Sequence, residues 1–136
     1  GMRAILTALK SNNMAAIVMY ENVGYVFPEG EGPPGVKPSG FGPIEVPLAE
    51  FRKLAKVPMQ VVWGDNVDKA GNYAARLEHS KLFVEKLKKY GGKGEVLQLP
   101  DAGLKGNTHI PFADMNNVAV ADLLSKFLAE HGLDKR

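Results

Sequence analysis

The stretch LQLPDAGLKGNTHIPFADMNN, residues 97–117, decides the fold and carries the first candidate for a functional residue. An apolar strand ends near Leu99, a loop with two glycines follows, and His109 lies at the tip of that loop. Open α/β sheets keep catalytic groups on loops at the carboxyl ends of strands. His109 is therefore a candidate catalytic residue. The alternative is a loop histidine at the start of the next helix, for which three cap residues follow: Asp114, Asn116 and Asn117.

The composition is that of an ordinary globular protein, and we expect a single domain over residues 1–136. Hydrophobic residues make up 45% and charged residues 24%, with a net charge of +2 and no basic run. This pattern argues against a nucleic-acid partner or a membrane surface. The chain has no cysteine, no metal-ligand spacing and no glycine-rich phosphate loop, so we expect no metal and no cofactor.

The order of patterns predicts an α/β fold with three layers, in which a short parallel sheet of about three strands is flanked by helices. Continuous apolar runs are typical of strands buried on both faces of a parallel sheet. Such runs, taken with helical spacing elsewhere, predict strands at 15–20, 59–63 and 95–99 and helices at 2–10, 47–55, 72–90 and 118–131. Parallel strands that are connected through helices take right-handed crossovers.

The segment 22–47 is rich in glycine and proline and is expected to be a long, lid-like loop. Its aromatic residues Tyr25, Phe27 and Phe41 suit contact with an apolar substrate. Trp63, at the end of the second predicted strand, is expected in the core or in the wall of a pocket. Tyr25, Phe27 and Trp63 are the candidate substrate-binding residues.

Polar side chains follow the predicted strands where each one ends. Glu21 follows the first strand, Asp65 the second with Asp68 close behind, and His109 the third. The carboxyl ends of parallel strands meet at one edge of the sheet. A carboxylate beside a histidine is the orienting half of a Ser-His-acid triad. The alternatives are that Glu21 is a solvated carboxylate at a strand end and that Asp65 is a turn former.

Two segments resemble the C-terminal part of an α/β-hydrolase-fold esterase. In VPMQVVWGDN…GGKGEVLQLPDAGLKGNTHIPFADMNN, the loop LP-x-x-G-x-x-GN-[ST]-H implies that His109 is the catalytic histidine. The segment AAIVMYENVGYVFPEGE is similar to a bacterial esterase subgroup whose acid is a glutamate, which would be Glu21. The commoner arrangement in the fold implies Asp65 or Asp68 instead. Relatives of this kind are often exported, and the sequence leaves the compartment open.

The chain departs from this family because it has no G-x-S-x-G nucleophile elbow. The helix at 2–10 resembles the one that follows the elbow. The resemblance therefore implies a truncated carboxylic-ester hydrolase that keeps the histidine and the acid, lacks the serine, and is inactive as this chain. The second hypothesis is a non-catalytic, oligomeric α/β remnant, or a small protein that binds an apolar, acyl-like ligand.

The predicted strand at 15–20 would have an unpaired apolar edge, and exposed edges recruit partner chains. We therefore expect a homodimer or higher oligomer through this edge and the N-terminal helix 2–10.

Overall fold

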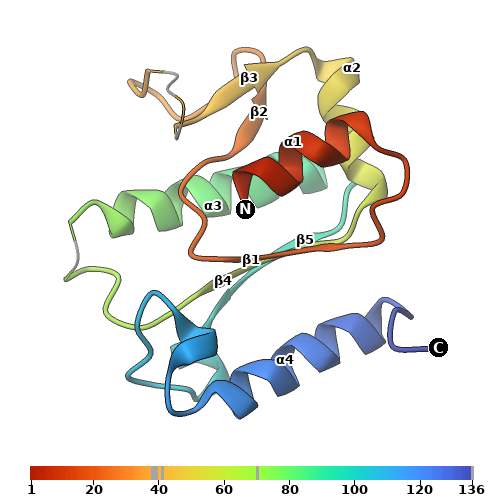
Figure 1. Ribbon diagram of the computed structural model, residues 1–136. Coiled ribbons are helices and arrows are strands. Elements are labelled where there is room, and N and C mark those ends of the chain that lie inside the picture. Colours follow the sequence, from red (N-terminus) through yellow and green to blue (C-terminus); the bar gives the residue numbers. More distant parts are fainter. Residues whose placement is uncertain (38–39, 41, 70, 136) are drawn as a thin grey trace.

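The fold is built on a three-stranded parallel sheet, as the sequence predicts. A computed structural model describes residues 1–37, 40, 42–69 and 71–135. The strands are β1 (Ile17–Tyr20), β4 (Met59–Trp63) and β5 (Gly94–Gln98), in the spatial order β1-β4-β5 (Figure 1). Both pairings are parallel. The strand expected at 15–20 begins two residues later, and the other two match their predictions to within one residue.

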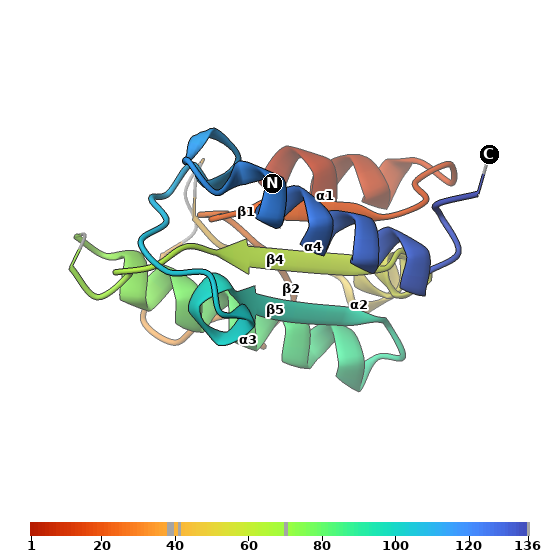
Figure 2. The same cartoon turned by 90° about the horizontal axis from the view of Figure 1, so that it is seen from below.

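Helices cover both faces of this sheet, so that the sheet is the middle one of three layers. On one side lie α1 (Met2–Lys10) and α3 (Tyr73–Lys89), and on the other lies α4 (Asn117–Glu130) (Figures 1 and 2). The helix expected at 47–55 is a short α2 (Leu48–Phe51) that tightens into a 3-10 helix over Arg52–Lys56. The three-layer α/β architecture is confirmed.

The central strand β4 explains where the core lies. All five of its residues are buried, because β4 has a strand on each side and helices on each face. Its one polar side chain, Gln60, donates from Nε2 to Glu95 Oε1 at 2.6 Å, which satisfies the amide in a buried position. The sequence MQVVW is therefore what a central parallel strand requires.

The segment 22–47 differs from the irregular loop that we expected. It contains β2 (Val26–Pro28) and β3 (Ile44–Val46), which pair in parallel as a second, two-stranded sheet. Residues 38, 39 and 41, with the predicted lid residue Phe41, lie outside the described residues. Phe27 in β2 packs edge-on against Phe83 of α3, at 6.3 Å between ring centroids. A lid role stays a prediction, but this packing holds β2 against the body of the protein.

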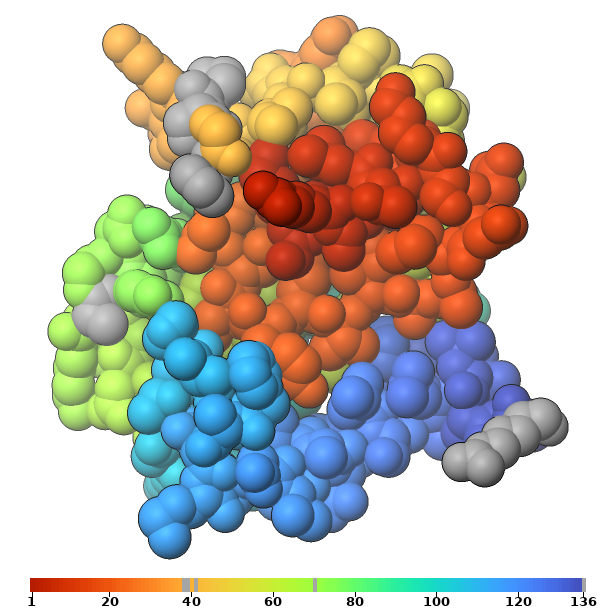
Figure 3. Space-filling view, in the orientation of Figure 1, coloured from red at the N-terminus to blue at the C-terminus, as the bar shows by residue number. Residues whose placement is uncertain are grey.

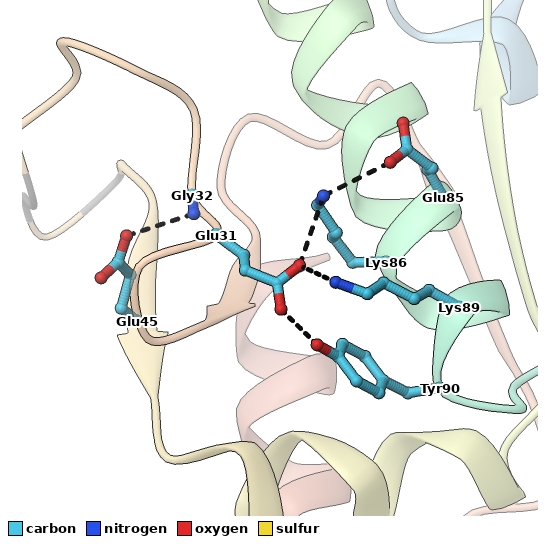
Figure 4. Close-up of polar contacts among 7 residues, drawn as sticks. All are labelled: Glu31, Gly32, Glu45, Glu85, Lys86, Lys89 and Tyr90. Carbon is cyan, nitrogen blue, oxygen red and sulfur yellow. Dashed lines mark hydrogen bonds and ion pairs between the residues drawn. The ribbon is translucent and has the colours of Figure 1, made fainter.

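A cluster of charges also anchors the segment to the last turn of α3 (Figure 4). Lys89 Nζ donates to Glu31 Oε2 at 2.7 Å, and the Tyr90 hydroxyl donates to the other oxygen. The Lys89 hydrogen bond is the main reason that the pKa of Glu31 is lowered to about 2. Glu45 of β3 accepts from the backbone N–H groups of Gly30 and Gly32. The turn after β2 is therefore held on both sides.

No helix in the described ranges is long and apolar enough to cross a membrane.

Strand β1 is an edge of the sheet in the part of the chain that is described. The backbone N–H groups of Ile17 and Glu21 donate toward β4, to the carbonyl oxygens of Pro58 and Val62. Since alternate residues of a strand point their polar groups in opposite directions, Val18 and Tyr20 direct theirs to the open side. This is the geometry that the expected oligomer needs.

The homodimer stays a prediction, and Val18→Pro tests it. Proline removes one outward N–H and leaves the hydrogen bonds to β4 intact, so it blocks pairing of the edge while keeping the fold. Sedimentation velocity at micromolar concentration should show an oligomer for the unaltered chain and a monomer for the variant. An unaltered chain that sediments as a clean monomer contradicts the prediction.

Candidate functional site

Glu21 occupies the residue directly after β1 and is held in an uncommon conformation. Its φ is +43°, in the left-handed region that side chains other than glycine rarely adopt. Its side chain is only 7% exposed, and Oε1 accepts a hydrogen bond from the backbone N–H of Gly64 at 2.8 Å. Strain of this kind persists where the surrounding structure over-determines it, often at functional sites.

Burial raises the pKa of Glu21 above its usual value. The Gly64 hydrogen bond and the charge of His109 act in the opposite direction and lower this pKa, while the charge of Asp114 raises it. The charge of His109 therefore affects the pKa of Glu21, although the two residues are 88 positions apart in the sequence.

His109 lies at the tip of its loop, exposed to solvent. Its ring meets Tyr73, the first residue of α3, at 6.1 Å between centroids and an interplanar angle of 68°. Tyr73 in turn lies edge-on to the buried Trp63 at 6.3 Å. An aromatic series therefore connects the imidazole to the end of the central strand.

An open cavity of about 280 Å³ joins these groups. It brings together the three predicted catalytic residues Glu21, Asp65 and His109. Figure 3 shows the loop that precedes α4 lying against the end of β1. The cavity is lined by Glu21, Asp65, Asn66, Val67, Lys69, Tyr73, Gly106, Asn107, Thr108 and His109.

Asp65 uses its carboxylate to join two loops. Oδ2 accepts from the Gly106 N–H at 2.9 Å and Oδ1 from the Asn66 N–H at 2.7 Å. These bonds, that to Gly106 foremost, lower the pKa of Asp65. These contacts with backbone N–H groups agree with the alternative that Asp65 is a turn former. Asp68 is exposed and does not line the cavity.

The cap residues before α4 have a different task from the one predicted. Asp114, Asn116 and Asn117 were expected to cap the helix. Asn116 occupies the N-cap position and Asn117 is the first helical residue, but no side-chain capping hydrogen bond is formed there. Instead Asp114 accepts hydrogen bonds from Thr108, and Asn116 exchanges amide hydrogen bonds with the buried Asn107. The helix start therefore holds the histidine loop.

The candidate substrate-binding residues lie in the core rather than on the cavity wall. Tyr25, Phe27 and Trp63 are each at most 1% exposed. Trp63 Nε1 donates to Ser80 Oγ at 3.0 Å, and the Tyr25 hydroxyl donates to the Asn22 carbonyl at 2.9 Å. Phe27 in β2, Trp63 in β4 and Tyr25, just before β2, are packed in the core, so none of them lines this cavity.

Tyr73, which was not among the site residues expected from the sequence, contributes an aromatic side chain to the cavity wall. Its position at the helix start, just after the strand-end loop with Asp65, is the signal that places it beside the site.

Gly64 is the second residue that sequence reasoning missed. A Cβ there would come within 2.5 Å of the Thr108 carbonyl oxygen and 2.8 Å of Glu21 Oε1. The strand end, the acid and the histidine loop converge on this one position, so only glycine fits without displacing one of them.

These groups include carboxylate and imidazole side chains that could act as acid and base, but no serine of the described residues lies among them. Of the serines within the described ranges, Ser11, Ser80 and Ser125, none lines the cavity, and Ser80 is buried against Trp63. Ser39 lies outside those ranges. No group of three or more metal-ligating side chains occurs among the described residues.

Comparison with known proteins supports an esterase-like fold. No family model and no curated protein matches this sequence. A solved structure described as that of a novel bacterial esterase matches with a TM-score of 0.71 and 29% sequence identity. The match covers 96% of this chain and 35% of the esterase chain. The protein therefore has a partial, esterase-like α/β fold that spans about a third of the esterase's length.

Gly64→Ala should destabilise the protein by about 1–3 kcal/mol, the usual cost of overpacking a close contact. The new methyl group must displace the Thr108 carbonyl or the Glu21 carboxylate. Urea unfolding measures the change. Gly40→Ala is the matched control, because no described atom lies within 4 Å of a Cβ at that position. Equal stability of the two variants would show that the three segments do not converge on Gly64.

Glu21→Gln should become increasingly stable, relative to the unaltered protein, as the pH rises. A folded-state pKa above the unfolded one means that the folded state binds more protons, so Glu21 lowers the free energy of unfolding as pH rises through that interval. Glutamine cannot ionise and keeps an oxygen for the Gly64 N–H. Urea unfolding between pH 4 and pH 8 should show the difference growing with pH.

Glu29→Gln, the same substitution at an exposed position, is the control for this comparison. A Glu21→Gln variant that loses stability relative to the unaltered protein as pH rises would reverse the sign argued here.

Proposed function

We propose that this chain carries the histidine and acid of a serine-type carboxylic-ester hydrolase. His109 is the general base and Glu21 is the acid that orients it. The serine nucleophile comes from a segment or chain beyond these 136 residues, so the chain alone is inactive. The observation that carries the proposal is the cavity at the carboxyl edge of the parallel sheet, which both His109 and the buried Glu21 line.

The contacts of the two candidate acids favour Glu21 over Asp65. Both oxygens of Asp65 already accept backbone N–H groups. Glu21 uses Oε1 for Gly64, and in the described part of the chain no hydrogen bond to Oε2 is found. The charge of His109 lowers the pKa of Glu21, whereas lysine charges act on Asp65. A free carboxylate oxygen that responds to the imidazole is what an orienting acid needs.

In the proposed reaction, His109 removes the proton from the serine hydroxyl as the oxygen attacks the ester carbonyl. The negative charge of Glu21 stabilises the imidazolium that forms. The imidazolium then gives its proton to the leaving alkoxide, and a water molecule hydrolyses the acyl-enzyme by the same route. The proposed substrate is a small carboxylic ester.

The second candidate function is binding of an apolar, acyl-like ligand without catalysis. An apolar groove of about 410 Å³ lies between the end of β1 and α4 and is lined by Tyr20, Phe112, Asn117, Val118, Val120, Ala121 and Leu124. Phe112 is 60% exposed beside it and meets Tyr20 at 5.6 Å between ring centroids. Exposed apolar patches of this kind mark interaction sites.

Hydrolysis of p-nitrophenyl acetate and butyrate tests the catalytic proposal. The chain alone should be inactive, and the chain expressed with the coding sequence directly upstream, if that supplies G-x-S-x-G in frame, should turn over. His109→Gln and Glu21→Gln should each lower kcat of the extended protein by about 10³-fold or more.

Asp65→Asn should cost much less, since Asp65 joins loops and does not orient the base. An extended protein that needs Asp65 and tolerates Glu21→Gln would assign the acid to Asp65. Absence of hydrolysis in both forms would overturn the catalytic proposal, and saturable binding of a fatty acid by the same chain would then favour the second candidate.

A further inference from the structure

The carboxylate of Asp114 accepts three hydrogen bonds from the two residues that precede His109. Its Oδ2 accepts from the Thr108 backbone N–H at 2.7 Å and from Asn107 Nδ2 at 3.1 Å. Its Oδ1 accepts from the Thr108 hydroxyl at 2.9 Å. Hydrogen bonds to an ionised acceptor are about twice as strong as neutral ones. These bonds lower the pKa of Asp114, against the effect of its desolvation.

The Thr108 hydroxyl links Asp114 to the residue that follows His109. Its oxygen donates to Asp114 and also accepts from the Ile110 backbone N–H at 3.1 Å. The residues before and after His109 are therefore both tied, directly or through one hydroxyl, to the same carboxylate. His109 is left with its side chain free at the tip, where it meets the edge of Tyr73.

The turn is also attached to the rest of the fold through Asn107, whose side chain is 2% exposed. Its Nδ2 donates to Asn116 Oδ1 at 2.6 Å, and its Oδ1 accepts from Asn116 Nδ2 at 2.9 Å. Its carbonyl accepts from the Asp65 N–H at 3.1 Å. The position of the turn is thus set relative to both the start of α4 and the end of β4.

We infer that Asp114 is the positioning residue of His109: by holding Thr108 directly and Ile110 through the Thr108 hydroxyl, it aims the imidazole into the cavity that Glu21 lines. This inference rests on the proposed function of His109. It gives Asp114 a role separate from that of the orienting acid, because its two oxygens already accept three donors.

The charge of Asp114 has a second effect on the site. It raises the pKa of Glu21, while the charge of His109 lowers the pKa of both carboxylates. The charge of His109 thus acts on two acids with different contacts: Asp114 accepts hydrogen bonds from the turn, whereas no hydrogen bond to Glu21 Oε2 occurs among the described residues. A purely structural anchor far from the site would leave the titration of Glu21 unchanged.

Two variants and a control separate these effects. Asp114→Asn removes the charge and leaves one oxygen as acceptor. Thr108→Val removes only the hydroxyl bridge and keeps the Asp114 charge. Asp122→Asn makes the same change of charge at an exposed position on α4. The readouts are amide hydrogen exchange at residues 108 and 110, the nuclear Overhauser contact between the rings of His109 and Tyr73, and the ¹³C titration of the Glu21 carboxyl.

Asp114→Asn should speed exchange at Thr108 and Ile110 by about tenfold, which corresponds to the loss of one charge-assisted hydrogen bond. It should also weaken the ring contact and lower the pKa of Glu21. Thr108→Val should speed exchange at Ile110 alone and leave the Glu21 titration unchanged, and it serves as the test if Asp114→Asn does not fold. Asp122→Asn should change none of the three readouts.

Unchanged exchange at Ile110 in both variants, or a ring contact that persists in Asp114→Asn, would overturn the inference. In the serine-containing protein, Asp114→Asn should lower kcat and leave KM unchanged. A different result separates the two proposals: if exchange responds as expected but His109→Gln leaves ester hydrolysis unchanged, the positioning of the turn stands and the catalytic proposal fails.

Discussion

The hydrogen bond from the Gly64 N–H to the carboxylate of Glu21 is the contact on which the candidate site depends. It joins the first residue after β1 to the first residue after β4, across neighbouring parallel strands. The same position touches the carbonyl of Thr108, so the histidine loop packs on this junction as well. Because the sheet is parallel, the ends of all three strands supply the site at one edge. A shift of β1 against β4 would separate the acid from the histidine.

This arrangement costs stability at neutral pH. Glu21 is buried in a left-handed backbone conformation, and its burial raises its pKa. A glycine would adopt this backbone conformation without strain, and a neutral side chain would be buried at lower cost than a carboxylate. Residues that break local preferences without a structural gain are expected at functional sites. The surrounding loops, by contrast, obey ordinary rules, since Asp65 and Asp114 both use their carboxylates to satisfy backbone N–H groups.

The parallel sheet could be predicted from the sequence. The continuous apolar runs that end at Tyr20 and Trp63 are typical of strands buried on both faces of a parallel sheet. The sequence was also sufficient to group Glu21, Asp65 and His109 at one edge, since the topology requires it. Prediction from the sequence failed where contacts between residues far apart in the chain determine the structure. The glycine- and proline-rich segment contains the short strands β2 and β3, which were not predicted. Packing of β2 on α3, pairing of β2 with β3 and the hydrogen bonds of Glu45 stabilise them rather than intrinsic strand preference. Three-dimensional packing likewise places Tyr73 on the cavity, and Trp63 behind it.

The most direct test of the account is the titration of the Glu21 carboxyl, followed by ¹³C-detected NMR, in the unaltered chain and in His109→Gln. If the two groups form a coupled pair, removal of the imidazole charge raises the pKa of Glu21, because that charge lowers it in the unaltered chain. His131→Gln, at the far end of α4, should leave the titration unchanged. A Glu21 pKa that is the same in His109→Gln as in the unaltered chain would contradict the pairing of His109 with Glu21.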